Sequence, residues 1–140
     1  MTIYTRPVHY YETDRMDCVH HSNYIRWFEE ARVHFMKENG FPYEGLEYSG
    51  IVSPVLSVEA DYHSMCRFGD TVDIAVKLLD YTRTRISFRY QVRDRETGEL
   101  RCDGRTSHCF VNEAGRPVSL KKVNPEYHRI VSELLAKEGE

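Results

Sequence analysis

Residues 22–39 read SNYIRWFEEARVHFMKEN, and this stretch decides the fold. Its apolar residues recur at spacings of three and four, which is the period of one helix face. They are Tyr24, Ile25, Trp27, Phe28, Ala31, Phe35 and Met36. The pattern predicts a helix of about 17 residues, with Ser22 as its N-cap and with Gly40 and Pro42 closing it. A helix that is apolar over so wide an arc needs a sheet to cover it.

The rest of the chain supplies that sheet. Residues 3–12 predict an edge or irregular strand, because Pro7 cannot donate a hydrogen bond to a neighbouring strand. Between residues 53 and 112 polar and apolar residues alternate, and turn signals at residues 67–70, 97–98 and 113–117 separate strands of about ten residues. This order predicts an antiparallel meander, then a shorter helix at residues 124–137. We expect an α+β fold, a curved antiparallel sheet wrapped around one long central helix, as a single domain over residues 1–140.

Composition and charge limit the class of protein. The chain is 41% hydrophobic and 29% charged, which is typical of a globular domain with one core. No apolar run approaches the ~20 residues of a membrane span, and the amino terminus lacks the apolar segment of a signal peptide, so we expect a cytoplasmic protein with no membrane contact. The net charge of -3 argues against non-specific nucleic-acid binding.

The cysteines and histidines do not predict a metal centre. The four cysteines form no Cys-x-x-Cys pair, so a disulfide framework or a structural zinc site has little support. Cys18, His20 and His21 are close in sequence, but adjacent side chains point in different directions and no second ligand pair follows. We expect free thiols, buried or half-buried, and no metal.

The sheet itself predicts an oligomer. A single curved sheet leaves at least one long strand edge without a partner. Pairing with the same edge of a second copy would extend the sheet and remove that edge. We therefore expect a homodimer or a homotetramer.

Residues 11–23, YETDRMDCVHHSN, join the first strand to the long helix and carry the chemistry. Asp14 precedes the helix start, where backbone N–H groups have no helical partner. Such donors can polarise a carbonyl oxygen while a carboxylate acts on the carbonyl carbon. This is an arrangement for acyl transfer.

The chain resembles the hotdog-fold acyl-CoA thioesterases, in the subfamily related to 4-hydroxybenzoyl-CoA thioesterase. The signature of that subfamily, approximately Tyr-x-x-Thr-Asp-x-x-Gly-x-Val-x-His-x-x-Tyr, matches YYETD at residues 10–14, VHH at 19–21 and Asn23 with Tyr24. Similarity continues through RWFEEAR at residues 26–32, VEADY at 58–62 and FGD at 68–70. The resemblance covers most of the chain and is weakest in the carboxy-terminal helix.

The resemblance implies a role for several residues. Asp14 corresponds to the catalytic carboxylate, and the backbone N–H of His21 to the donor that polarises the thioester carbonyl. Tyr24 would line the acyl pocket. The active sites of the family lie at a dimer interface, so the partner would contribute pocket wall and contacts to the nucleotide part of CoA. Neither a metal nor an organic cofactor is implied.

Asp17 departs from the signature, which has Gly at this position. Gly adopts positive φ without steric cost, and Asp tolerates positive φ better than most residues. Asp17 is therefore either a permissive loop residue or a second carboxylate near Asp14 that would raise one of the two pKa values.

Each assignment has a structural alternative. An acidic residue before a helix is commonly a cap or a dipole partner, and the His21 imidazole is itself a possible general base. Arg83 and Arg85 fit the oxygens of the CoA phosphates, as do Lys121 and Lys122 less specifically, but arginine on an exposed strand is usually only solvated.

The first hypothesis for function is an acyl-CoA thioesterase that releases a carboxylic acid and CoA. Asp14 would either attack the carbonyl or activate water, and the sequence leaves both routes open. The alternatives are a thioesterase for acyl groups on acyl-carrier protein and a hotdog module that binds an acyl ligand without turnover.

Overall fold

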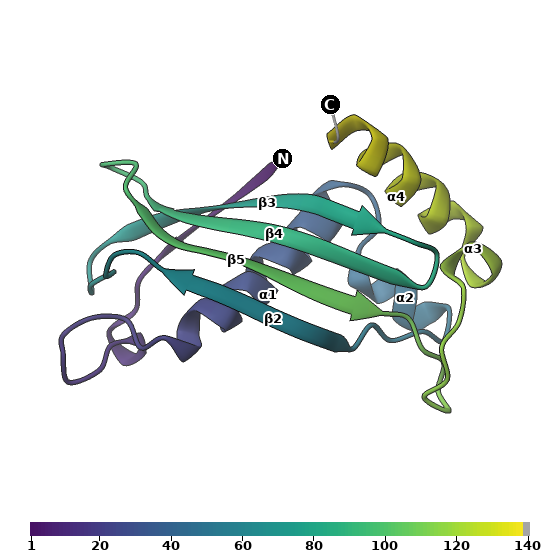
Figure 1. Ribbon diagram of the computed structural model, residues 1–140, viewed down its shortest axis with the longest axis horizontal. Coiled ribbons are helices and arrows are strands. Elements are labelled where there is room, and N and C mark those ends of the chain that lie inside the picture. Colours follow the sequence, from purple (N-terminus) through teal and green to yellow (C-terminus); the bar gives the residue numbers. More distant parts are fainter. Residues whose placement is uncertain (139–140) are drawn as a thin grey trace.

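The computed structural model describes residues 1–138, and its sheet has five antiparallel strands in the order β1-β3-β4-β5-β2, with α1 across one face (Figure 1). The strands are β1 (Thr2–Pro7), β2 (Val55–Tyr62), β3 (Thr71–Tyr81), β4 (Arg85–Asp94) and β5 (Leu100–Cys109). The helices are α1 (Ser22–Glu38), α2 (Tyr43–Tyr48), α3 (Leu120–Val123) and α4 (Pro125–Glu138), with a 3-10 turn η1 at Tyr10–Glu12. The predicted α+β fold, a sheet wrapped around one central helix, is confirmed.

The long helix forms where the periodicity predicts it, but its details differ in two respects. The N-cap is His21, so Ser22 is the first helical residue and the predicted cap was wrong by one position. The Ser22 N–H instead donates to Nδ1 of His20 at 3.2 Å. Ile25 is 43% exposed, so the buried face is narrower than the apolar stripe. The short helices α2 and α3 were not predicted, because four to six residues are too few to show a period.

The predicted meander is correct for β3, β4 and β5 and wrong for β2. The turn at residues 67–70 exists, since the Asp70 N–H donates to the Arg67 carbonyl at 3.1 Å. It leads, however, from β2 at one edge of the sheet to β3 near the other, and β2 pairs with β5. A turn signal marks where a strand ends and does not specify which strand the next one joins.

Gly104 in β5 sets how closely α1 approaches the sheet. The Phe28 ring of α1 stacks on Tyr90 of β4 with centroids 4.4 Å apart. A Cβ at Gly104 would lie 2.6 Å from both the Phe28 ring and the Glu59 carbonyl oxygen. The absence of a side chain at this position therefore fixes the depth at which the helix packs.

The edge strand β2 is open and apolar. Four of its large hydrophobic side chains are exposed: Val55, Leu56, Val58 and Tyr62. Exposed apolar edges favour pairing with another chain. Separately, no helix within residues 1–138 is long and apolar enough to cross a membrane.

Candidate active site

The loop between η1 and α1 is held in one conformation by backbone hydrogen bonds. The Asp14 N–H donates to the Cys18 carbonyl at 2.9 Å, and the His20 N–H donates to the Glu12 carbonyl at 2.9 Å. The Val19 N–H donates to the Cys66 carbonyl at 2.8 Å and fastens the loop to the segment that follows β2. The loop therefore presents its side chains from a fixed backbone.

One oxygen of the half-buried Asp14 carboxylate is held and the other is free. Oδ1 accepts the Met16 N–H at 2.8 Å and lies 3.8 Å from the Cys18 Sγ. Among residues 1–138, Oδ2 has no hydrogen-bond donor. An oriented carboxylate with one free oxygen is suited to attack a carbonyl or to take a proton from water.

Asp17 occupies the backbone conformation that glycine adopts most easily. Its φ is 63°, in the left-handed region. Its N–H donates to the Asp14 carbonyl at 3.0 Å, and its own carbonyl accepts Nη1 of Arg67 at 3.3 Å. No hydrogen bond within the described residues joins the Asp17 side chain to the Asp14 carboxylate. The backbone thus accounts for this position without a catalytic role.

The start of α1 offers one unused backbone donor. The Ser22 N–H is taken by His20 Nδ1, and the Asn23 N–H donates to the His20 carbonyl at 3.0 Å. The His21 N–H has no acceptor in the part of the chain that the structure describes. The His21 ring is exposed and stacks on His20 with centroids 4.2 Å apart. The His21 backbone N–H is therefore a free donor at the helix start, and its role toward a thioester stays a prediction.

A buried ionic cluster supports this loop from behind, and the sequence did not reveal it. The Glu12 side chain, 3% exposed, accepts Nη1 of Arg6 at 2.8 Å and Nε1 of Trp27 at 2.7 Å. Burial raises the pKa of Glu12, but the hydrogen bonds from Arg6 and Trp27 outweigh it and leave the pKa below its usual value. The Glu12 carbonyl also accepts Nδ2 of Asn23 at 2.8 Å, which ties the loop to the first turn of α1.

Tyr24 lies in the core next to this cluster. Its ring packs against Trp27 and Tyr62 with centroids 4.9 and 5.3 Å away, and burial raises its pKa. It does not line the apolar cavity described below, so its predicted place in an acyl pocket stays a prediction.

Arg83 and Arg85 lie at the opposite end of the subunit from the loop. They follow β3, where the chain turns into β4, near α3 (Figure 1). Arg83 contributes a carbonyl to the Leu120 N–H at 2.8 Å. Within one chain, the structure therefore brings together Asp14, Asp17 and His21 and leaves the two arginines apart from them.

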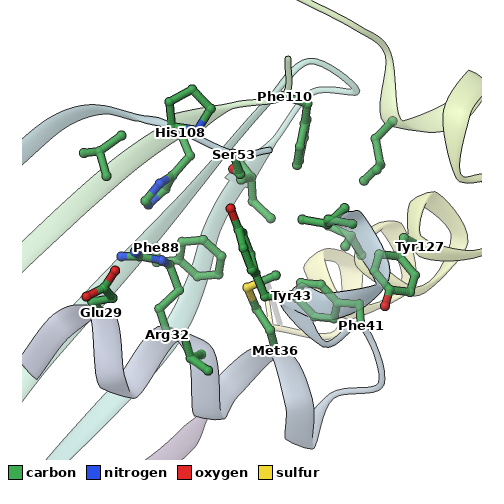
Figure 2. Close-up of a pocket in the computed structure, with 17 residues that line it drawn as sticks. Glu29, Arg32, Met36, Phe41, Tyr43, Ser53, Phe88, His108, Phe110 and Tyr127 are labelled. Carbon is green, nitrogen blue, oxygen red and sulfur yellow. The ribbon is translucent and has the colours of Figure 1, made fainter. Parts of the chain in front are cut away.

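An apolar cavity of about 240 Å³ lies at that opposite end (Figure 2). Its wall is formed by the second half of α1, by α2 and α4, and by β4 and β5, and it is mainly apolar. Arg32 and His108 are polar exceptions. Sequence reasoning missed this cavity because its wall comes from segments far apart in the chain. None of the predicted site residues lines it.

His108 has an unusual environment in that wall. It is 1% exposed, and its Nε2 lies 2.8 Å from Oγ1 of Thr106. Burial, and to a lesser extent the charge of Arg32, lowers the pKa of His108 to about 4. The imidazole is therefore neutral at physiological pH.

This depressed pKa predicts a pH-dependent stability. The unfolded chain binds a proton at His108 near pH 6.5, but the folded protein does so only near pH 4, so folding becomes less favourable as pH falls between these values. From pH 7 to pH 5 we expect this group to lower the free energy of unfolding by about 2 kcal/mol. His108→Gln retains an acceptor for Thr106 and should lack this part of the dependence in urea titrations at the two pH values. An unchanged dependence in the variant would contradict the assignment.

Metal chemistry finds no support in the side chains. Within residues 1–138 no three His, Cys, Asp or Glu side chains are grouped so that they would hold a metal ion. Cys18, Cys66 and Cys102 are buried free thiols and Cys109 is half-buried, as predicted.

Comparison with known proteins places the chain in a family. Residues 8–133 match the model of the thioesterase-like superfamily. A protein of Bacillus subtilis (strain 168) named "Putative acyl-CoA thioesterase YneP" is 32% identical over 122 residues, which is 86% of this chain and 88% of that protein. The structure of a DHNA-CoA thioesterase from Staphylococcus aureus superposes with a TM-score of 0.93 at 30% identity, over 99% of this chain and 95% of that chain.

A more distant structure shows the same fold. The 1,4-dihydroxy-2-naphthoyl-CoA thioesterase of Synechocystis has a TM-score of 0.83 at 16% identity, covering 94% of this chain and 96% of that chain. The resemblance read from the motifs is thereby confirmed. The chain belongs to the thioesterase-like superfamily of thioester hydrolases and has the hotdog fold.

Proposed function

We propose that this protein hydrolyses an acyl-CoA thioester to a carboxylic acid and free CoA. The observation that carries the proposal is the pairing, on one rigid loop, of a free Asp14 carboxylate oxygen with a free His21 N–H. The names of the relatives, an acyl-CoA thioesterase and a DHNA-CoA thioesterase, support the same reaction class.

The two groups divide the chemistry between them. The His21 N–H donates to the thioester carbonyl oxygen and stabilises the negative charge that develops there. Asp14 either attacks the carbonyl carbon to form a mixed anhydride, which water then cleaves, or takes a proton from a water molecule that attacks in its place. Both routes end with the thiol of CoA as leaving group, and neither requires a metal or an organic cofactor.

A second copy completes the site in this proposal. The Tyr62 hydroxyl, at one end of β2, donates to the His21 carbonyl at 3.2 Å, and Val55, at the other end of β2, lines the cavity. Two β2 edges paired antiparallel about a two-fold axis place the Tyr62 end of each copy beside the Val55 end of the other. The loop of one copy then faces the cavity of its partner.

We expect a homodimer or larger homo-oligomer by light scattering. Val58→Glu places a charge on the open β2 edge, where Val58 is 37% exposed, and should shift the protein to monomer with loss of activity. Ile3→Glu is the matched control, since Ile3 is 51% exposed on β1, at the other edge of the sheet from β2. A monomeric wild type with full activity would rule out the shared site.

Pairing of the β2 edges of two copies also gives Arg83 and Arg85 a role. Ile86 pairs with His108 and His108 with Val55, so the start of β4 lies at the cavity end of the sheet. Burial lowers the pKa of His128, and the charges of Lys121 and Arg83 lower it further. The Leu120 N–H donates to the Arg83 carbonyl at 2.8 Å, which brings the adjacent Lys121 near Arg83. Arg83 and Arg85 of one copy, with Lys121, would then bind phosphate near the loop of the other.

This basic group also favours the second candidate, hydrolysis of an acyl group carried by acyl-carrier protein, whose prosthetic arm has a phosphate too. A panel of aliphatic and aromatic acyl-CoAs and the matching acyl-carrier proteins, assayed by release of free thiol, separates the candidates. Turnover of acyl-CoA alone supports the main proposal, and preference for the carrier-protein esters supports the second. No release from any thioester would leave only a binding module.

Asp17 should prove conformational. Asp17→Gly and Asp17→Asn both tolerate the φ of 63°, and both remove the charge. We expect both to keep kcat within about threefold of wild type, because neither alters the backbone that positions Asp14. A collapse of kcat in both variants would make Asp17 a catalytic partner.

A further inference from the structure

His108 and Arg32 form a donor patch in a cavity that is otherwise mainly apolar. Figure 2 shows the His108 ring on the sheet side and the Arg32 side chain on α1 extending toward one another. Nη1 of Arg32 donates to the Tyr90 hydroxyl at 3.2 Å, which is the one hydrogen bond of this guanidinium within residues 1–138. Its remaining N–H groups have no acceptor there. Glu29 lies beside it but is joined to it by neither a hydrogen bond nor an ion pair.

A chain of hydroxyl groups determines which nitrogen of His108 carries the proton. The Tyr90 hydroxyl lies 2.6 Å from Oγ1 of Thr106, which lies 2.8 Å from Nε2 of His108. Tyr90 is fully buried, and its oxygen already accepts from Arg32. The Tyr90 hydroxyl therefore donates its hydrogen bond to Oγ1 of Thr106. If Thr106 donated to Tyr90 instead, the buried Tyr90 O–H would have no acceptor.

The direction of the first bond sets the next ones. Since Oγ1 of Thr106 accepts the hydrogen bond from Tyr90, the Thr106 hydroxyl donates its own hydrogen bond to Nε2 of His108. A neutral imidazole that accepts at Nε2 carries its hydrogen at Nδ1. Nδ1 has no hydrogen-bond partner in the described chain, although His108 is 1% exposed. The cavity wall thus holds an N–H donor that has no partner among the described residues.

We propose that His108 and Arg32 select an acyl group that carries a hydrogen-bond-accepting oxygen beyond the thioester. The inference rests on the proposed function in so far as the acyl group is a thioester substrate. Binding of the corresponding free acid at His108 and Arg32 does not depend on that reaction. An acyl group of pure hydrocarbon would cover both donors without offering an acceptor, and each unsatisfied donor disfavours its binding. A hydroxyl, oxo or carboxylate oxygen at this depth satisfies them, and the surrounding apolar wall holds the carbon skeleton.

The tautomer is tested first, without any substrate. In protein labelled with nitrogen-15 at histidine, long-range proton–nitrogen NMR spectra at pH 7 distinguish the two neutral tautomers, and we expect His108 to be protonated at Nδ1. Loss of one histidine signal set in His108→Gln assigns the resonance. A proton at Nε2 would remove the donor from the cavity and overturn the proposal.

Selectivity is tested with matched substrates. Octanoyl-CoA is compared with its hydroxylated, oxo and ω-carboxylate forms, and benzoyl-CoA with its hydroxy and carboxy forms. We expect kcat/KM to favour at least one oxygenated form by tenfold or more, since sites built to bond an oxygen reject analogues that lack it. The neutral and anionic forms separate recognition of a hydroxyl or oxo oxygen from that of a carboxylate.

Variants assign the preference to the two residues. His108→Leu and Arg32→Met should each reduce the preference to near unity, and His108→Gln, whose amide can both accept from Thr106 and donate to the cavity, should restore part of it. Arg93→Met, an exposed arginine on β4, is the control and should keep it. Equal kcat/KM for all members of each series in wild type would overturn the proposal. The two donors would then be available to bind the thioester carbonyl itself.

A protein without any thioesterase activity would refute the proposed reaction but would still report on this site. In that case the corresponding free acids are added to the labelled protein. Shifts of the His108 Nδ1 signal that are larger with the oxygenated acids than with octanoic or benzoic acid uphold the inference, and Arg93→Met should show the same difference. Equal shifts with both kinds of acid reject it.

Discussion

Asp14→Asn should lower kcat by at least ~100-fold while the fold and the dimer persist. The amide oxygen of asparagine still accepts the Met16 N–H that Oδ1 accepts at 2.8 Å, so the loop keeps its turn. In the variant, an NH2 group takes the position of the free Oδ2, or a neutral oxygen takes it if the amide is flipped about the Cβ–Cγ bond. Neither has the charge needed to attack a carbonyl or to accept a proton from water.

The expected loss separates the catalytic role from a structural one. If Asp14 only capped the loop, asparagine would serve nearly as well, because both residues accept from backbone N–H groups at such positions. Asp17→Asn is the matched control, since it removes a carboxylate three residues away on the same loop. The measurement is kcat with the best acyl-CoA of the panel, on protein shown by mass spectrometry to be free of wild type. Near-normal turnover by Asp14→Asn would refute the assignment.

The parts of the site that the sequence predicted are those that are local in the chain. Asp14, Asp17 and His21 lie within eight consecutive residues, and their relations are set by backbone turns and by the helix start. A motif over so short a stretch specifies both residue types and geometry. The helix α1 was predicted equally well from the sequence, because the helical spacing of its apolar residues repeats over 17 residues.

What the sequence did not predict depends on pairing between distant segments. β2 lies beside β5 at one edge of the sheet, and no local signal in the sequence specifies that pairing. The series Arg32, Tyr90, Thr106 and His108 joins α1, β4 and β5, and its hydrogen bonds depend on how the helix packs on the sheet. A polar residue on a strand can be assigned as exposed or buried only after the order of the strands in the sheet is known.

The ionic cluster behind the loop illustrates the same limit. Arg6 is on β1, Glu12 in η1 and Trp27 in α1, and each would pass for an ordinary surface or core residue in sequence. Burial of a charged pair is costly unless both members are bonded, and here Glu12 accepts three hydrogen bonds through its side chain, from Arg6, Trp27 and the His9 N–H. The cluster fixes both ends of the loop, which explains how a surface loop holds Asp14 and the His21 N–H in a defined geometry.

His21→Pro should reduce kcat by 10²–10³-fold, the loss of about 3 kcal/mol that removal of one oxyanion donor typically causes. The structure makes this an unusually clean deletion. The φ of His21 is -56°, close to the value that proline imposes, and its N–H has no acceptor within residues 1–138. Proline is also well tolerated where a helix begins. The substitution therefore removes the proposed donor without breaking a hydrogen bond of the protein.

His21→Ala is the matched variant, because it removes the imidazole and keeps the N–H. We expect it to retain most of the wild-type rate, since the exposed ring packs against the rings of His20 and Tyr62 and its nitrogens make no hydrogen bond within residues 1–138. Circular dichroism and light scattering must show the same helix content and the same oligomer for both variants before rates are compared. With those unchanged, a proline variant as fast as wild type removes the His21 N–H from the mechanism. An alanine variant as slow as the proline one transfers the role to the imidazole, because only the ring is missing there.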